Sequence, residues 1–164
     1  MAAARPHSPS SARTERGRGF TLLELLMTLT VIALLTGVAL PSYSRIIRGQ
    51  RIAQCERDLR LIAMSIERYR TRTFQVPQDL GQLGTAPPKD PWGRDYQFLN
   101  FASPAPGVKG KIRKDHNLHP LNSEFDLYSL GEDGRSSAPL TAQASHDDVI
   151  WARDGAFVGI ATDY

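Results

Sequence analysis

One carboxylate stands inside a long apolar segment, where its charge needs an explanation. Glu24 lies in Phe20–Leu40, a run of 21 residues that contains no Lys, Arg or Asp. A helix of this length rises about 30 Å, which is the thickness of one hydrocarbon core. An ionised carboxylate in a bilayer costs roughly 3 kcal/mol, and intramembrane acids are therefore usually functional. Because a buried acid is tolerable with a charge partner and expensive without one, Glu24 is expected to have such a partner.

Two ordinary interpretations of the apolar run stay open beside this one. The run could be a secretory signal peptide, since Gly37-Val38-Ala39 has the small-x-small pattern of a cleavage site. It could also be a plain permanent anchor. Against a signal peptide, the run exceeds the usual 7–15 apolar residues, contains Glu24 and is closely followed by Pro41.

A second group of acids lies near the C-terminus. Asp133 stands in the turn 130–135, and the adjacent pair Asp147-Asp148 follows. Calcium takes six to eight oxygens, mixing carboxylates with backbone carbonyls, and the two glycines of the turn allow a tight loop. A cation would also relieve the repulsion within the acidic pair. We expect a calcium site here, with an ordinary polar turn as the alternative.

The other chemical patterns are weak. Asp115, His116 and His119 are suitable ligand types for a transition metal, but neighbouring basic side chains repel cations and favour a surface loop. Ser129 lacks the G-x-S-x-G elbow of a nucleophilic serine, and no glycine-rich phosphate loop is visible. We therefore expect no enzymatic activity.

A long helix should position the first of these residues. The helical pattern runs from Phe20 to about Arg72, and Pro41 should bend or locally melt it. Beyond Pro41 one apolar stripe recurs at helical spacing, and its members are Ile52, Cys55, Leu59, Ile62, Ile66 and Tyr69. The opposite face carries many arginines. Such a face can contact nucleic acid or lipid headgroups, but a solvated face that meets acidic neighbours in an assembly is favoured.

A sheet should cover the apolar stripe and carry the second group of acids. Tyr96–Phe101 and Phe125–Leu130 are rich in aromatic and β-forming residues and predict strands, with Val149–Trp151 and Phe157–Ala161 as weaker candidates. Ser103–Asn122 contains several prolines and basic residues and predicts a long exposed loop.

The net positive charge of the chain comes from the residues before Gly19. The four arginines and one glutamate before Gly19 carry a net charge of +3, which equals the formal charge of the whole chain. The rest is balanced, so nucleic acid is not an expected partner. By the positive-inside rule, these arginines place the N-terminus in the cytoplasm.

Gly19, Phe20 and Glu24, in the sequence GFTLLE, resemble the N-terminal signature of type IV prepilins and type II secretion pseudopilins. The resemblance implies that a membrane peptidase cuts between Gly19 and Phe20 and methylates the new N-terminus. The amine on Phe20 of a neighbouring subunit would then be the charge partner of Glu24. Pro41 also resembles the family pattern.

Two further segments resemble the major pseudopilins of type II secretion. Asp90–Tyr96 resembles their DPWG-x-x-Y segment, and Phe125–Gly134 followed by Asp147-Asp148 resembles their calcium loop. The resemblance implies that calcium is bound by two carbonyls and three carboxylates, those of Leu130, Arg135, Asp133, Asp147 and Asp148. Chelation is then expected to lower the melting temperature.

The expected fold is α+β and type IV pilin-like, with a long N-terminal helix, membrane-spanning in its first half, packed on a small antiparallel sheet with a C-terminal loop. We divide the chain into a removed leader (1–19), a transmembrane and filament-core helix (20–40), an amphipathic continuation (41–74) and a globular β region with the calcium-type loop (75–164).

The resemblance implies a structural filament subunit of a type II secretion pseudopilus that drives protein export. Alternatives are a major or minor type IV pilus subunit and a DNA-binding minor pilin. Expected partners are copies of this chain, the prepilin peptidase, minor pseudopilins, the inner-membrane assembly platform and, before assembly, membrane lipid. The expected location is the bacterial inner membrane, crossed once, with a periplasmic C-terminal domain that later joins a periplasmic or surface filament.

Overall fold

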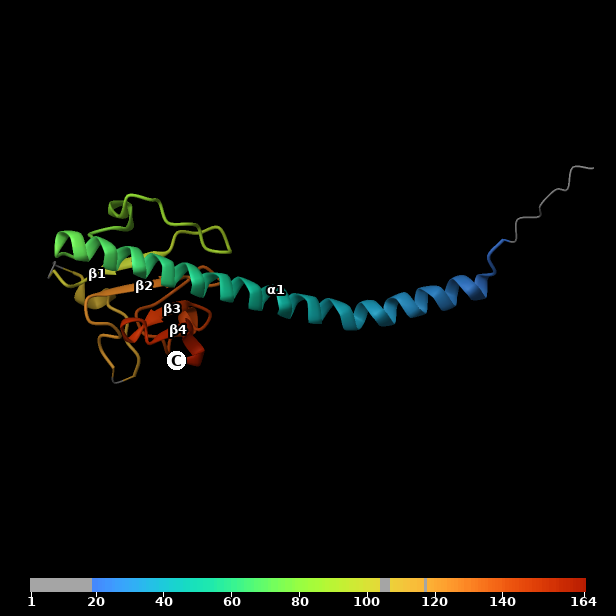
Figure 1. The fold of residues 1–164 in the computed structure, drawn as a ribbon. Coiled ribbons are helices and arrows are strands. Elements are labelled where there is room, and N and C mark those ends of the chain that lie inside the picture. Colours follow the sequence, from blue (N-terminus) through green and yellow to red (C-terminus); the bar gives the residue numbers. More distant parts are fainter. Residues whose placement is uncertain (1–18, 104–106, 117) are drawn as a thin grey trace, which may run out of the picture. The chain divides into compact units, whose positions relative to one another are not determined.

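The computed structural model describes residues 19–103, 107–116 and 118–164 (Figure 1). The predicted leader lies outside them, apart from Gly19. The chain forms two compact units, which meet between Tyr43 and Ser44. One helix, α1 (Leu22–Thr73), belongs to both, and the second unit also contains four strands and five short 3₁₀ helices. The long helix predicted from the sequence is confirmed. It is continuous across Pro41, so the predicted local melting does not occur.

The strands form one antiparallel sheet in the order β1-β2-β3-β4. They are β1 (Gln97–Asn100), β2 (Phe125–Ser129), β3 (Val149–Ala152) and β4 (Phe157–Ile160). All four strands predicted from residue composition are present, and the α+β class is confirmed. The 3₁₀ helices lie in the connections, at Leu80–Leu83, Lys109–Lys111, Gln143–Ser145, Arg153–Gly155 and Ala161–Asp163.

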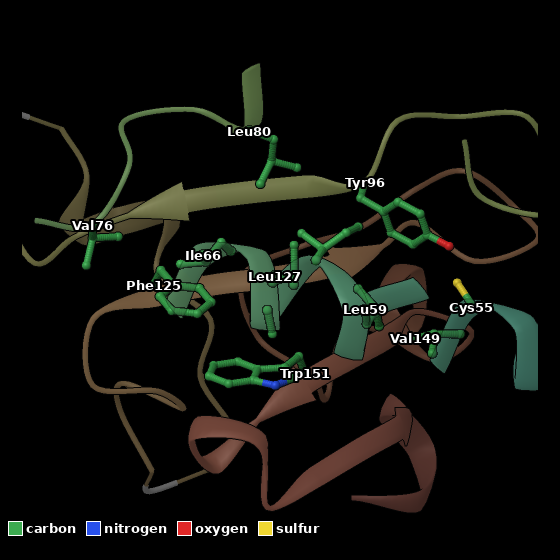
Figure 2. Close-up of a cluster of buried hydrophobic side chains, with 12 residues drawn as sticks. Cys55, Leu59, Ile66, Val76, Leu80, Tyr96, Phe125, Leu127, Val149 and Trp151 are labelled. Carbon is green, nitrogen blue, oxygen red and sulfur yellow. The ribbon is translucent and has the colours of Figure 1, made fainter. Parts of the chain in front are cut away.

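The apolar stripe of α1 packs on one face of this sheet (Figure 2). Leu59 and Ile66 are fully buried, and they join a cluster that includes Leu127 of β2 and Trp151 of β3. The Phe125 and Trp151 rings are stacked with centroids 4.8 Å apart. The predicted stripe is therefore confirmed as the core-facing side of the helix.

The opposite face of the sheet is covered by loops. Ile150 and Ala152 of β3 pack there in a second cluster with Leu121 and Leu140, which lie in the connections before β2 and before β3. The prediction that Ser103–Asn122 is an exposed loop is wrong in part, because Arg113, Leu121 and Asn122 are buried. This connection folds back onto the sheet because it hydrogen-bonds and packs with residues of β2 and β3. Its own polar composition gives no sign of these contacts.

Candidate functional site

The peptide bond after Gly19 lies in an irregular segment directly before α1. Phe20 is 81% exposed, and a methyl group added to Gly19 would meet no atom within 4 Å. The fold itself therefore makes no demand for glycine at position 19. If glycine is required at this position, the requirement comes from another molecule that binds the segment, such as a peptidase.

The first turn of α1 is capped by a threonine. Thr21 Oγ1 accepts a hydrogen bond from the backbone N–H of Glu24 over 3.2 Å, in the T-x-x-E spacing of a capping box. Glu24 is exposed, and it forms no ion pair within the described part of the chain. Its carboxylate stands in the positive end of the helix dipole and remains available to a cation from another molecule. The sequence carries the signal for this cap, although the prediction did not use it.

The helix up to Tyr43 presents large apolar side chains outward. Leu22 is 85% exposed and Leu34 is 71% exposed, and the other leucines described in this stretch are also exposed. Three threonine hydroxyls are satisfied by helix carbonyls three or four residues earlier, those of Thr28, Thr30 and Thr36. Such internal bonds leave the surface apolar. No helix in the described residues is both long enough and apolar enough to cross a membrane.

In the second unit, Asp90 organises the turn that precedes β1. Its Oδ1 accepts hydrogen bonds from the backbone N–H groups of Trp92 (3.1 Å) and Arg94 (2.7 Å). Its Oδ2 accepts the hydroxyl of Ser129, at the end of β2, over 2.7 Å. Asp90 is 4% exposed and Ser129 is fully buried. Ser129 is therefore a structural link between two turns rather than a nucleophile.

Arg94 extends this link to the turn after β2. It donates from Nη1 to the carbonyl of Gly131 over 2.6 Å and from Nη2 to that of Glu132 over 3.1 Å. A methyl group on Gly134 would lie 2.7 Å from the guanidinium carbon of Arg94. The turn 130–135 thus wraps closely around a positive side chain. The resemblance of Asp90–Tyr96 to a family segment was visible in the sequence, but it gave no role to Asp90 or Arg94.

Asp133 and Asp147 both hydrogen-bond to backbone N–H groups of this turn. Asp133 Oδ1 accepts the N–H of Arg135 over 2.7 Å, and Asp147 Oδ2 accepts the N–H of Asp133 over 2.8 Å. Gly131 has φ 64°, and a methyl group there would collide with Asp147. These two acids therefore hold the shape of the turn, through the backbone N–H groups of Asp133 and Arg135.

Asp148 has different surroundings. It is fully buried, and its Oδ2 accepts hydrogen bonds from Arg113 Nη2 and Ser136 Oγ, each over 2.6 Å. Its Oδ1 is buried without a hydrogen-bond partner in the described part of the chain. Burial raises the pKa of Asp148, and the Arg113 charge opposes that rise. Arg113 is a partner that the sequence analysis missed.

The predicted calcium ligands are partly engaged by groups of the protein itself. Within residues 19–103, 107–116 and 118–164, no three His, Cys, Asp or Glu side chains come together as a metal site. The free Oδ1 of Asp148 could supply one ligand, but calcium needs six to eight oxygens. Asp133 and Asp147 each already use one carboxylate oxygen to accept a backbone N–H. Calcium binding stays a prediction, and the geometry does not favour it.

The weaker candidate residues lie either at the surface or in the core. His116 and His119 are exposed, and the Nδ1 atom of His116 lies 2.9 Å from Asp115 Oδ1. Cys55 is fully buried in the core, as predicted, and burial raises the pKa of its thiol from 9.0 to about 11. This thiol is therefore kept protonated at neutral pH.

Comparison with known proteins shows what the N-terminal segment and the chain as a whole are similar to. Residues 16–40 match the family model described as the prokaryotic N-terminal methylation motif. This match covers Gly19, Phe20 and Glu24, and the fold that follows is a long helix packed on a small antiparallel sheet. The prediction of a pilin-like chain is confirmed. No solved structure matches the chain significantly.

The similar curated proteins are more specific. The chain is 28% identical over 138 residues to the type II secretion system core protein G of Pseudomonas aeruginosa, covering 71% of this chain and 84% of that protein. It is 27% identical to the core protein G of Pectobacterium carotovorum (73% and 78% covered) and 26% identical to that of Klebsiella pneumoniae (73% and 88% covered). The predicted resemblance to the pseudopilins of type II secretion is thus confirmed.

Proposed function

We propose that this chain is a structural subunit of a type II secretion pseudopilus. The observation that carries the proposal is the similarity to core protein G along most of both chains, together with the methylation motif at the start of α1. The division of the molecule supports it, because one unit turns its apolar side chains outward while the other has its own core.

In this proposal the prepilin peptidase removes residues 1–19 and methylates Phe20. The exposed and irregular segment at Gly19–Thr21 suits such an enzyme, which must bind an extended peptide. Before assembly, Phe20–Leu40 anchors the chain in the inner membrane, with Ser44–Tyr164 in the periplasm. The apolar sequence of this segment and the arginines before it support that orientation.

Assembly then places the amine of Phe20 on one subunit beside Glu24 of the next. An exposed carboxylate in the first turn of an apolar helix is costly in lipid and is stabilised by a neighbouring cation. Copies of this chain are therefore the main partners, with minor pseudopilins and the inner-membrane platform completing the machine.

The test is filament formation by cells that overproduce the chain, followed by immunogold electron microscopy and by secretion in a strain that lacks its own subunit. Gly19→Leu should block processing and filament formation. Glu24→Ala should be processed but form at least tenfold fewer filaments. Glu67→Ala is the matched control, since this acid is exposed on α1 in the second unit and should assemble normally.

The outcomes also separate this proposal from its alternatives. Restored secretion with filaments that depend on Glu24 supports a pseudopilus subunit. Long surface fibres without any rescue of secretion would indicate a type IV pilus subunit instead. Salt-dependent DNA binding by the chain would indicate an uptake pilin.

A further inference from the structure

A buried guanidinium lies where the two long C-terminal connections meet. The side chain of Arg113 is 3% exposed, and that of Asp148 is fully buried. Arg113 donates from Nη2 to Asp148 Oδ2 over 2.6 Å and from Nη1 to the Ser137 carbonyl over 2.8 Å. Its guanidinium carbon lies 4.3 Å from the centroid of the Tyr128 ring. A charge so far removed from water is stable only with partners of this quality.

The backbone beside Arg113 is held as closely as its side chain. The N–H of Arg113 donates to Asp126 Oδ2 over 2.7 Å. The N–H of Lys114 donates to the carbonyl of Ala138 over 3.1 Å, and the N–H of Leu140 donates to the carbonyl of Lys114 over 2.9 Å. The connection before β2 is therefore joined to the connection before β3, and it delivers a fixed positive charge to Asp148.

A second guanidinium occupies the neighbouring turn. Arg94 binds the carbonyls of Gly131 and Glu132, which belong to the turn in which the sequence predicts the neutral calcium ligands. Arg94 thus engages two carbonyls of the turn, and Arg113 engages one carboxylate oxygen of Asp148. A divalent cation at this loop would be repelled by both charges, and Asp148 Oδ2 and the carbonyls of Gly131 and Glu132 are already engaged.

We propose that Arg113 and Arg94 perform the task that calcium would perform in this loop, so that the C-terminal domain closes without a metal ion. Arg113 neutralises Asp148 and ties the two connections together. Arg94 gathers the carbonyls of the turn and, with Asp90, ties that turn to the start of β1. The cations are part of the chain, so the loop is closed at any calcium concentration.

The first test measures the response of the chain to calcium. The full-length mature chain in detergent micelles is melted with EGTA, with millimolar calcium and with millimolar magnesium. The proposal predicts melting temperatures within about 1 °C of one another, because an ion that does not bind cannot stabilise the folded state. A lower melting temperature in EGTA that calcium restores would overturn it.

The second test removes the cation. Arg113→Gln leaves the Asp148 carboxylate buried without its charge partner and should lower the melting temperature by roughly 10 °C. The matched control is Lys114→Gln, which removes the same charge from an exposed neighbouring side chain and should change the melting temperature by less than about 2 °C. Equal melting temperatures for the two variants would contradict the proposal.

A third measurement keeps the proposal testable if Arg113→Gln does not fold. Calcium is titrated into the unaltered chain in an isothermal calorimeter. The absence of saturable heat up to millimolar calcium is the expected result. Stoichiometric binding would show that the arginines do not replace the ion.

Discussion

The two units of this chain use the same kinds of apolar residue in opposite ways. Leu26, in the unit that ends at Tyr43, is 59% exposed, whereas Leu59, on the same helix in the second unit, is fully buried. Burying a leucine contributes about 1.5–3 kcal/mol. In the second unit that free energy stabilises the fold. In the first unit the leucines are exposed, so the same free energy is gained only when lipid or neighbouring subunits cover them.

The comparison teaches that stability and assembly are separable in this molecule. The second unit has a helix-on-sheet core, a second cluster under its loops and several buried polar links. The described residues of the first unit, from Gly19 onward, have an apolar surface and one exposed acid, Glu24. Substitutions in the second unit should therefore change unfolding, and both tryptophans, Trp92 and Trp151, report on that unit by fluorescence.

The largest expected effect on stability comes from a charge in the helix stripe. Ile62 is 3% exposed in the core, so Ile62→Asp would bury an unpaired carboxylate and should destabilise the second unit by about 4 kcal/mol or prevent its folding. The measurement is denaturant unfolding followed by tryptophan fluorescence.

The neighbouring residue provides the control for this change. Leu61 is 60% exposed, and Leu61→Asp should alter the free energy of unfolding by less than about 0.5 kcal/mol. If both variants unfolded alike, the helix face assigned to the core would be wrong.

A smaller effect is expected from the buried link between the two turns. Asp90→Ala removes the acceptor of two backbone N–H groups and of the Ser129 hydroxyl, so it should cost about 2–3 kcal/mol in the same unfolding assay. Asp95→Ala is the control, because the carboxylate that it removes forms an exposed ion pair with Lys89, and its loss should cost less than about 1 kcal/mol. Similar losses in both variants would argue against a structural role specific to Asp90.

The smallest effect concerns the pH dependence of the second unit. Because burial raises the pKa of Cys55 from 9.0 to about 11, the unfolded chain releases a proton between these values that the folded chain keeps. Stability should therefore fall as pH rises from 9 to 11, with Cys55 contributing up to about 2 kcal/mol. Unfolding curves at pH 8 and pH 10.5 should show a weaker loss for Cys55→Ala. An equal loss would assign the effect to other groups, such as Tyr96, whose pKa burial also raises.

The parts of the fold that could be predicted are those with local signals. The stripe through Leu59 and Ile66 repeats at helical spacing, and β2 is marked by its own aromatic residues, Phe125 and Tyr128. The partners of the buried polar residues could not be predicted in this way. Asp90 and Ser129 are 39 positions apart, and Arg113 and Asp148 are 35 apart.

Arg113 illustrates why the candidate site was only partly predictable. It stands near Lys111 and Lys114 in a proline-containing connection, a context typical of exposed surface. Its burial depends on an acid that lies beyond β2, so no window around Arg113 contains the signal. The sequence predicts Asp133, Asp147 and Asp148 as ligands of an ion, whereas the partners they have in the structure are backbone N–H groups, a serine hydroxyl and an arginine.

The central claim is that the first unit is processed into an assembly helix that begins at Phe20. Mass spectrometry of the mature chain, purified from membranes of a strain with a type II secretion system, tests it most directly. The account predicts an N-terminal peptide that starts at Phe20 and is heavier by one methyl group, and its loss in Gly19→Leu. A mature chain that starts at Leu40, or one that keeps residues 1–19, would contradict the account.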